Sequence, residues 1–262
     1  MAIIIFTFGA IFGSFLNVLI YRLPEGVGVV RKKSHCPKCG KTLKWHELIP
    51  VLSFFLLRGK CSGCKAKISW QYPAVEIISG LIWILVFFKI FNFQFLIFNQ
   101  FSISNFQLLA FFYQIFILSS LVVISFIDVR KMIIPDKIVY PAIFVSLLYN
   151  LARKDILIPL AAALAAFSVF YLIIFFSKGR AMGFGDVKLA ALMGLFLSYP
   201  DILAALWWAF VLGAIFGIML IAVGRKGLKS QLPFGPFLAL GTLIAYFFSW
   251  KMFINFIINL SI

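Results

Sequence analysis

The stretch of sequence that decides the fold spans residues 106–128 and reads FQLLAFFYQIFILSSLVVISFID. Its first 22 residues carry no charge, and about 20 apolar residues are enough to cross a bilayer as a helix. The charge that ends it, Asp128, is one of only eight acidic residues in the chain. This stretch therefore predicts a transmembrane helix with a carboxylate at one end.

The whole chain shares this apolar character. Of its 262 residues, 63% are hydrophobic and 12% are charged, and the mean hydropathy is +1.08. A soluble domain is about one quarter charged, so this composition excludes that class. We predict an all-α polytopic membrane protein with about eight spans, at roughly 2–20, 74–92, 106–127, 138–152, 156–176, 187–199, 203–223 and 235–258.

Positive charge indicates which side of these spans faces the cytoplasm. Twenty of the 24 Lys and Arg residues fall on one side of this topology. Cytoplasmic loops are rich in Lys and Arg, so the long polar loop at 22–73 is predicted to be cytoplasmic and both termini outside the plasma (inner) membrane. The net charge of +16 is then interpreted as a signature of orientation, not of nucleic-acid binding.

These spans and loops predict five segments along the chain. The segments are a first transmembrane helix at 1–21, a cytoplasmic metal-binding loop domain at 22–73, a second helix with an outer loop at 74–105, a membrane core at 106–225, and a cytoplasmic loop with the last helix at 226–262.

All four cysteines lie in the cytoplasmic loop, as two Cys-x-x-Cys pairs: Cys36, Cys39, Cys61 and Cys64. Two such pairs can complete a tetrahedral site of thiolates, which favours zinc. Gly40 and Gly63 are expected to supply the permissive backbone of the two turns. Disulfides are the alternative, but a reducing cytosol disfavours them. Four thiolates leave no open position for water, so the zinc is predicted to be structural, within a small zinc-ribbon-like lobe between helices 1 and 2.

Two aspartates are the strongest candidates for chemistry, because ionisable groups at membrane depth are costly and usually functional. Asp128 ends the third predicted span, where a simple interfacial residue neutralised by Arg130 and Lys131 is the alternative. Asp186 begins the sixth, in Gly-Phe-Gly-Asp at 183–186, where it is alternatively an N-cap. The two preceding glycines predict a close approach by another backbone.

A pair of close carboxylates shares a proton, and this arrangement favours hydrolysis. The ionised group activates a water molecule and the protonated one polarises the carbonyl. Helix-end fields predict that Asp186, at a helix N-terminus, ionises first and that Asp128, at a C-terminus, keeps the proton.

The combined motifs resemble the type IV prepilin peptidases, a family of membrane aspartic proteases with a Gly-x-Gly-Asp motif. The resemblance covers nearly the whole chain. Its motifs occur at 13–18, 21–24, 36–39, 61–64, 68–69, 72–76, 128, 134–136, 183–189 and 233–236.

The resemblance implies an enzyme that removes the basic leader of prepilins and pseudopilins after a glycine, in a pilus or a type II secretion system. Methylation of the new N-terminus, usually Phe, by S-adenosylmethionine is implied by the resemblance alone. Asp128 and Asp186 take the catalytic positions, and supporting roles are expected for Gly183, Gly185, Lys188, Asp136 and Glu76.

Several alternatives stay open from the residues themselves. Glu76 needs a partner, and the basic loop residues are available; it is alternatively a site for the cationic leader or the methyl donor. Gly13 and Ser14 predict close helix packing, and Asn17 an interhelical hydrogen bond. A proton- or cation-coupled transporter uses similar carboxylates, although its sites lie near the midplane. A zinc-bearing scaffold without catalysis is the third reading.

Overall fold

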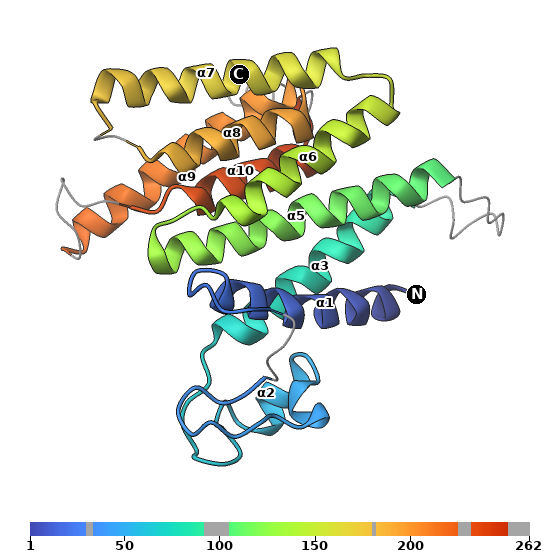
Figure 1. The fold of residues 1–262 in the computed structure, drawn as a ribbon, viewed down its shortest axis with the longest axis vertical. Helices are drawn as coiled ribbons and strands as arrows, with labels where there is room; N and C mark the ends of the chain where they lie inside the picture. The colour runs from blue at the N-terminus through green and yellow to red at the C-terminus, as the bar shows by residue number, and fades with distance from the viewer. Residues whose placement is uncertain (30–33, 92–104, 180–181, 225–231, 251–262) are drawn as a thin grey trace, which may run out of the picture. The chain divides into compact units, whose positions relative to one another are not determined.

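The computed structural model describes residues 1–29, 34–91, 105–179, 182–224 and 232–250. Within these ranges the regular elements are helices, accompanied by two isolated β-bridges. The predicted all-α class is confirmed. The chain divides into two compact units, Met1–Val123 and Ile124–Ile262, and helix α5 (Asn105–Lys131) contains the boundary (Figure 1).

In the first unit, α1 (Ala2–Arg22) packs along α3 (Gln71–Phe91). Glycines bring the two backbones together: a Cβ added at Gly13 would lie 2.8 Å from the Glu76 Cα. The Asn17 side chain of α1 donates a hydrogen bond to the Tyr72 carbonyl at 3.1 Å. Both the predicted packing at Gly13 and the predicted interhelical bond of Asn17 are confirmed.

A small lobe connects these two helices. It contains the 3-10 helix η1 (Trp45–Leu48), the short helix α2 (Leu52–Leu56) and the bridges His35–Thr42 and Lys60–Lys67. Two short helices and two bridges bury little apolar surface, so this lobe needs another source of stability.

The second unit is a helical bundle around α8 (Phe184–Leu197). Its other helices are the end of α5, α6 (Asp136–Ala152), α7 (Leu157–Ser177), α9 (Asp201–Ala222) and α10 (Gly235–Phe247). Helix α8 contacts α6, α7, α9 and α10, and Figure 1 shows it between α7 and α10. At Gly194 an added Cβ would lie 2.5 Å from the Ala163 Cα, so small residues permit this close packing.

Among the described residues, five helices are long and apolar enough to cross a membrane: α1, α3, most of α5, α7 and α9. The other predicted spans coincide with α6, α8 and α10, which have 17, 14 and 13 residues. The number eight therefore stays a prediction, although α8 is covered by other helices and has little need to match the bilayer thickness. The predicted outer loop at 92–104, the loop at 226–231 and the end of the last span at 251–258 lie outside the described residues.

Candidate active site and metal site

Asp128 lies in the last turn of α5 and is buried, with 5% of its surface exposed. Its Oδ2 accepts a hydrogen bond of 2.9 Å from the backbone N–H of Gly235. Gly235 is the first residue of α10, so its N–H is one of the donors at that helix end that lack a partner within the helix. Sequence reasoning missed this partner, which explains why a carboxylate at the end of its own helix is tolerated.

Asp186 is the third residue of α8 and is also buried, with 8% exposed. The helix begins at Phe184 and its N-cap is Gly183, so the interpretation of Asp186 as the N-cap itself is wrong. The carboxylate nevertheless serves the helix end, because it accepts a hydrogen bond of 3.3 Å from the Gly183 N–H. This contact with the helix end is therefore compatible with the catalytic role predicted for Asp186.

The ends of three helices meet around these aspartates. Asp128 and Asp186 are near enough to interact electrostatically, and Gly235 of α10 contacts Asp128. Each carboxylate now lies beside a helix N-terminus, at α10 and α8 respectively. At Asp128 the N-terminus of α10 opposes the field of the α5 C-terminus, and the predicted order of ionisation stays a prediction.

The two glycines before Asp186 have different surroundings. A Cβ added at Gly185 would lie 2.9 Å from the Ile134 Cβ, so a glycine is required for close contact with the α5–α6 connection. The approaching group is a side chain, which corrects the expectation of a backbone. At Gly183 the nearest group is Asp186 Oδ2, at an ordinary 3.8 Å, so Gly183 is not required by close packing.

Two supporting candidates form an ion pair beside this site. Lys188 of α8 binds the carboxylate of Asp136, the first residue of α6. The same ammonium lies over the rings of Tyr140 and Phe184, at 5.3 and 5.4 Å from their centroids. These contacts fix the start of α8 against the start of α6, and so hold the turn that carries Asp186.

Glu76, the remaining supporting candidate, lies in the first unit and is buried in α3. Its Oε2 accepts a hydrogen bond of 2.7 Å from the Val51 N–H of the lobe, and its side chain also bonds to Ser14. The partners are thus a backbone amide and a hydroxyl, where a basic loop residue was expected. Val51 has a φ of 61°, which is strained for a β-branched residue.

The four cysteines form a compact cluster in the lobe. Their sulfur atoms all lie within 4.8 Å of one another, and the Cys36 and Cys64 Sγ atoms are 3.9 Å apart. A tetrahedral zinc with bonds of about 2.3 Å separates its sulfurs by about 3.8 Å, so the cluster fits a metal ion. Backbone N–H groups of Cys39 and Lys38 lower the pKa of Cys36 to about 6, which favours the thiolate.

The two turns of the cluster repeat one backbone pattern. The Cys36 N–H bonds to the Lys41 carbonyl, and the Cys61 N–H bonds to the Ala66 carbonyl. The residue after each second cysteine has a positive φ, 69° at Gly40 and 57° at Lys65. The role expected for Gly63 is therefore wrong, because it does not supply the left-handed residue. A Cβ added at Gly63 would lie 3.1 Å from the Lys41 Cδ, so its small size leaves room for the first turn.

Glu47 joins the two turns, and sequence reasoning missed it. Its carboxylate binds the Lys41 ammonium at 3.1 Å and the Ser62 hydroxyl. Lys41 closes the first metal-binding turn by its bond to Cys36, and Ser62 lies between the two cysteines of the second turn. The Lys44 N–H also donates to it at 2.8 Å. These donors, the Lys44 amide first and then Ser62 and Lys41, lower the pKa of Glu47 to about 2. Glu47 is therefore ionised at neutral pH and organises the cluster.

Comparison with known proteins gives the context for both sites. Residues 7–90 match the family described as Bacterial Peptidase A24 N-terminal domain, and residues 115–218 match the Type IV leader peptidase family. A protein of Bacillus subtilis (strain 168), named prepilin leader peptidase/N-methyltransferase, is 30% identical over 268 residues, covering 100% of both chains. This chain belongs to the type IV leader peptidase family.

Other family members are similarly related to it. The protein of the same name from Myxococcus xanthus (strain DK1622) is 34% identical over 88% of this chain and 66% of its own length. That of Pseudomonas putida is 31% identical over 90% of this chain and 87% of its own. No solved structure matches the chain. None of these relatives is named a transporter, so that alternative gains no support.

Proposed function

We propose that this chain is a membrane-embedded aspartic endopeptidase that removes the basic leader from prepilins or pseudopilins after a glycine. The observation that carries the proposal is the meeting of two buried carboxylates, Asp128 and Asp186, at the ends of α5 and α8 in a member of this family. The relatives' shared name adds the substrate class.

The two aspartates act as a pair with one shared proton. The ionised carboxylate takes a proton from a water molecule, whose oxygen attacks the carbonyl carbon of the scissile peptide. The protonated carboxyl donates a hydrogen bond to the carbonyl oxygen. A proton then passes to the leaving nitrogen, the C–N bond breaks, and the dyad returns to its starting state.

The surrounding residues position the dyad in this proposal. The Gly235 N–H holds the Asp128 carboxylate in place, and Gly183 does the same for Asp186. Gly185 admits Ile134, and the Asp136–Lys188 pair joins α6 to α8. These contacts limit the movement of the carboxylates, since an error of about 1 Å in catalytic geometry can cost roughly 100-fold in rate.

Topology supports the substrate class. A prepilin has an apolar helix behind a basic leader, so it reaches the enzyme laterally with its cleavage point at the cytoplasmic interface. The positive-inside rule assigns the lobe and both aspartates to that face, with the termini outside. The dyad then lies at the depth of the scissile bond.

Methylation is the second activity of the proposal and rests on the relatives' name. S-adenosylmethionine would supply the methyl group to the new N-terminal amine. No described residue is assigned to that donor, and the proposed cleavage does not depend on it.

We further propose that the metal of the lobe is zinc and that it is structural. The sulfur cluster fits a tetrahedral ion, and a set of four thiolates leaves no coordination position for a substrate. Metal analysis of purified protein should find one zinc per chain. Chelation should expose the lobe to protease while Asp128 and Asp186 stay in place.

The decisive experiment mixes purified protein in detergent with a prepilin peptide. Mass spectrometry should find a cut after the leader glycine, and labelled S-adenosylmethionine should then mark the new N-terminus. A folded protein that cuts none of several prepilins would overturn the peptidase proposal, and uptake of a cation by proteoliposomes would favour the transporter instead. Cleavage without label would remove only the methylation.

A further inference from the structure

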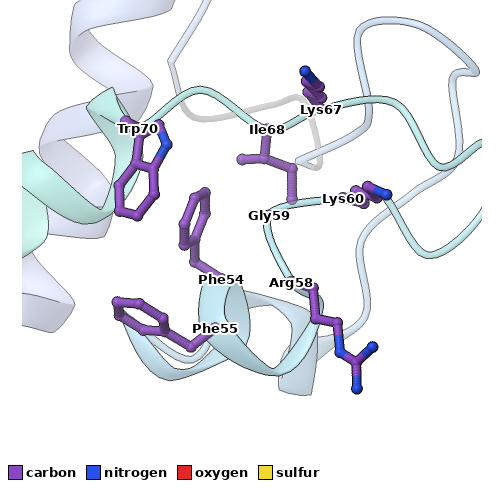
Figure 2. A pocket seen from close by; sticks show the side chains of 8 residues that line it. All are labelled: Phe54, Phe55, Arg58, Gly59, Lys60, Lys67, Ile68 and Trp70. Carbon is purple, nitrogen blue, oxygen red and sulfur yellow. The ribbon is translucent and has the colours of Figure 1, made fainter.

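The lobe carries a pocket that the proposed cleavage does not use. It has a volume of about 360 Å³ and is lined by Phe54, Phe55, Arg58, Gly59, Lys60, Lys67, Ile68 and Trp70. Figure 2 shows the three rings gathered on one side, with the three cationic residues spread around the other. The Phe54 and Trp70 ring centroids are 4.8 Å apart, so the rings form one contiguous aromatic wall.

The charge of this pocket indicates an anionic occupant. Its lining holds three cations, Arg58, Lys60 and Lys67, and no acidic residue. Lys60 and Lys67 lie directly opposite each other in an antiparallel bridge, and like charges in such a pair are destabilising. An anion placed between them relieves this repulsion.

An apolar face adjoins the pocket. Helix α2 exposes Leu52, Phe55 and Leu56 by 60%, 56% and 78%, and Trp70 is 69% exposed. Large apolar side chains exposed together mark an interaction surface. Beside cations, they are typical of segments that lie in the headgroup region of a membrane.

The chain places this face next to a membrane-spanning helix. Trp70 immediately precedes α3 (Gln71–Phe91), an apolar helix that is long enough to cross a bilayer. Tryptophan is enriched at such span ends because its ring suits the headgroup level. The same unit contains both the pocket and α3, so the lipid surface lies within reach of this face.

We propose that the metal lobe docks on the lipid surface through this face. Leu52, Phe55, Leu56 and Trp70 enter the interfacial region, and the Arg58, Lys60 and Lys67 cations around the pocket bind phosphates of anionic phospholipid headgroups. This interaction goes beyond the proposed cleavage and methylation, and it holds the lobe at a fixed depth beside the bilayer.

The methyl donor fits the same pocket poorly. S-adenosylmethionine carries a sulfonium and an ammonium against one carboxylate, so its net charge is positive. The three cations of the lining repel it, and no acidic side chain there compensates. The chemistry therefore favours a lipid phosphate.

The test uses the full chain in nanodiscs of phosphatidylcholine, with and without phosphatidylglycerol, and measures hydrogen exchange in residues 52–70. Phosphatidylglycerol should slow exchange there in the unaltered protein. The variant with Arg58→Gln, Lys60→Gln and Lys67→Gln should lose this slowing. Its affinity for the phosphatidylglycerol surface should fall by up to about 100-fold, because each cation near an anionic surface contributes roughly fivefold in affinity. A matched variant loses three exposed cations elsewhere in the lobe, Lys38→Gln, Lys44→Gln and Lys65→Gln, and should keep it.

Four outcomes would overturn the proposal. An exchange rate that is the same with and without phosphatidylglycerol would exclude lipid docking. An equal loss of the slowing in both triple variants would show attraction by bulk charge alone. Slowing by inorganic phosphate in phosphatidylcholine nanodiscs would indicate a soluble anion. Slowing by S-adenosylmethionine alone would assign the pocket to the donor. Cleavage of a prepilin in detergent, measured on the same variants, reports separately on the proposed function.

Discussion

The metal lobe and the carboxylate site are built over different distances along the chain. In the lobe, Cys36 bonds to Lys41 and the other turn repeats that pattern within a few residues. In the carboxylate site, Asp128 bonds to Gly235, 107 residues away. The lobe is therefore encoded by local spacing and a metal, whereas the carboxylate site exists only when the whole second unit is packed.

This difference predicts two kinds of sensitivity. Changes in the lobe should act through metal affinity and leave the aspartates in place. Changes at the helix ends of the second unit should act through the position of a carboxylate, and their size should depend on how directly the altered atom contacts Asp128 or Asp186.

Replacing either aspartate tests the carboxylate site most severely. Asp128→Asn or Asp186→Asn should lower prepilin cleavage by at least about 10³-fold, because an amide can neither accept the water proton nor share one. Rates with purified protein in detergent provide the measurement. Asp155→Asn, at an exposed loop position, should leave the rate unchanged. Retention of a tenth of the activity by either catalytic variant would remove the dyad.

Gly235→Ala moves the first aspartate without altering its chemistry. The added Cβ would lie 2.8 Å from Asp128 Oδ2 and 3.4 Å from its Cβ, so the carboxyl must shift. We expect cleavage to fall about 100-fold, consistent with a displacement of roughly 1 Å. Gly217→Ala in α9 is the matched control, since its added Cβ meets only Leu232 Cδ1, at 3.5 Å. Equal rates for both variants would show that Gly235 does not position Asp128.

The same contrast explains what the sequence predicted. Apolar length located the helices, and cysteine spacing located the sulfur cluster, because both depend on neighbouring residues. The role of Gly63 was misassigned because it was inferred from residue type alone. Aligning the two turns by their cysteines pairs Gly40 with Lys65, which are the residues with positive φ. The contact between Gly235 and Asp128 had no local signal, since a helix N-terminus does not reveal which distant side chain it faces.

A third prediction concerns the lobe alone. Glu47→Ala should weaken zinc binding by about 10- to 100-fold, because groups that orient a metal site typically have effects of this size. Glu47 binds Lys41 of the first metal-binding turn and Ser62 of the second. Competition with a chromogenic chelator measures the affinity, and Glu25→Gln provides a charge-matched comparison. A fall in cleavage as large as the fall in zinc affinity would contradict the separation of the two regions.

The smallest effect is expected at the Asp136–Lys188 pair, which separates positioning from direct contact with substrate. The Asp136 side chain is 54% exposed and that of Lys188 is 15% exposed, and such pairs contribute about 0–1 kcal/mol. Asp136→Asn and Lys188→Met should each lower cleavage by about fivefold or less. The double variant should cleave at about the same rate as each single variant, because both substitutions remove the same ion pair. A far larger fall in the cleavage rate with Lys188→Met than with Asp136→Asn, together with a raised KM, would give a different result. It would show that the Lys188 ammonium binds the substrate and does not act through Asp136 alone.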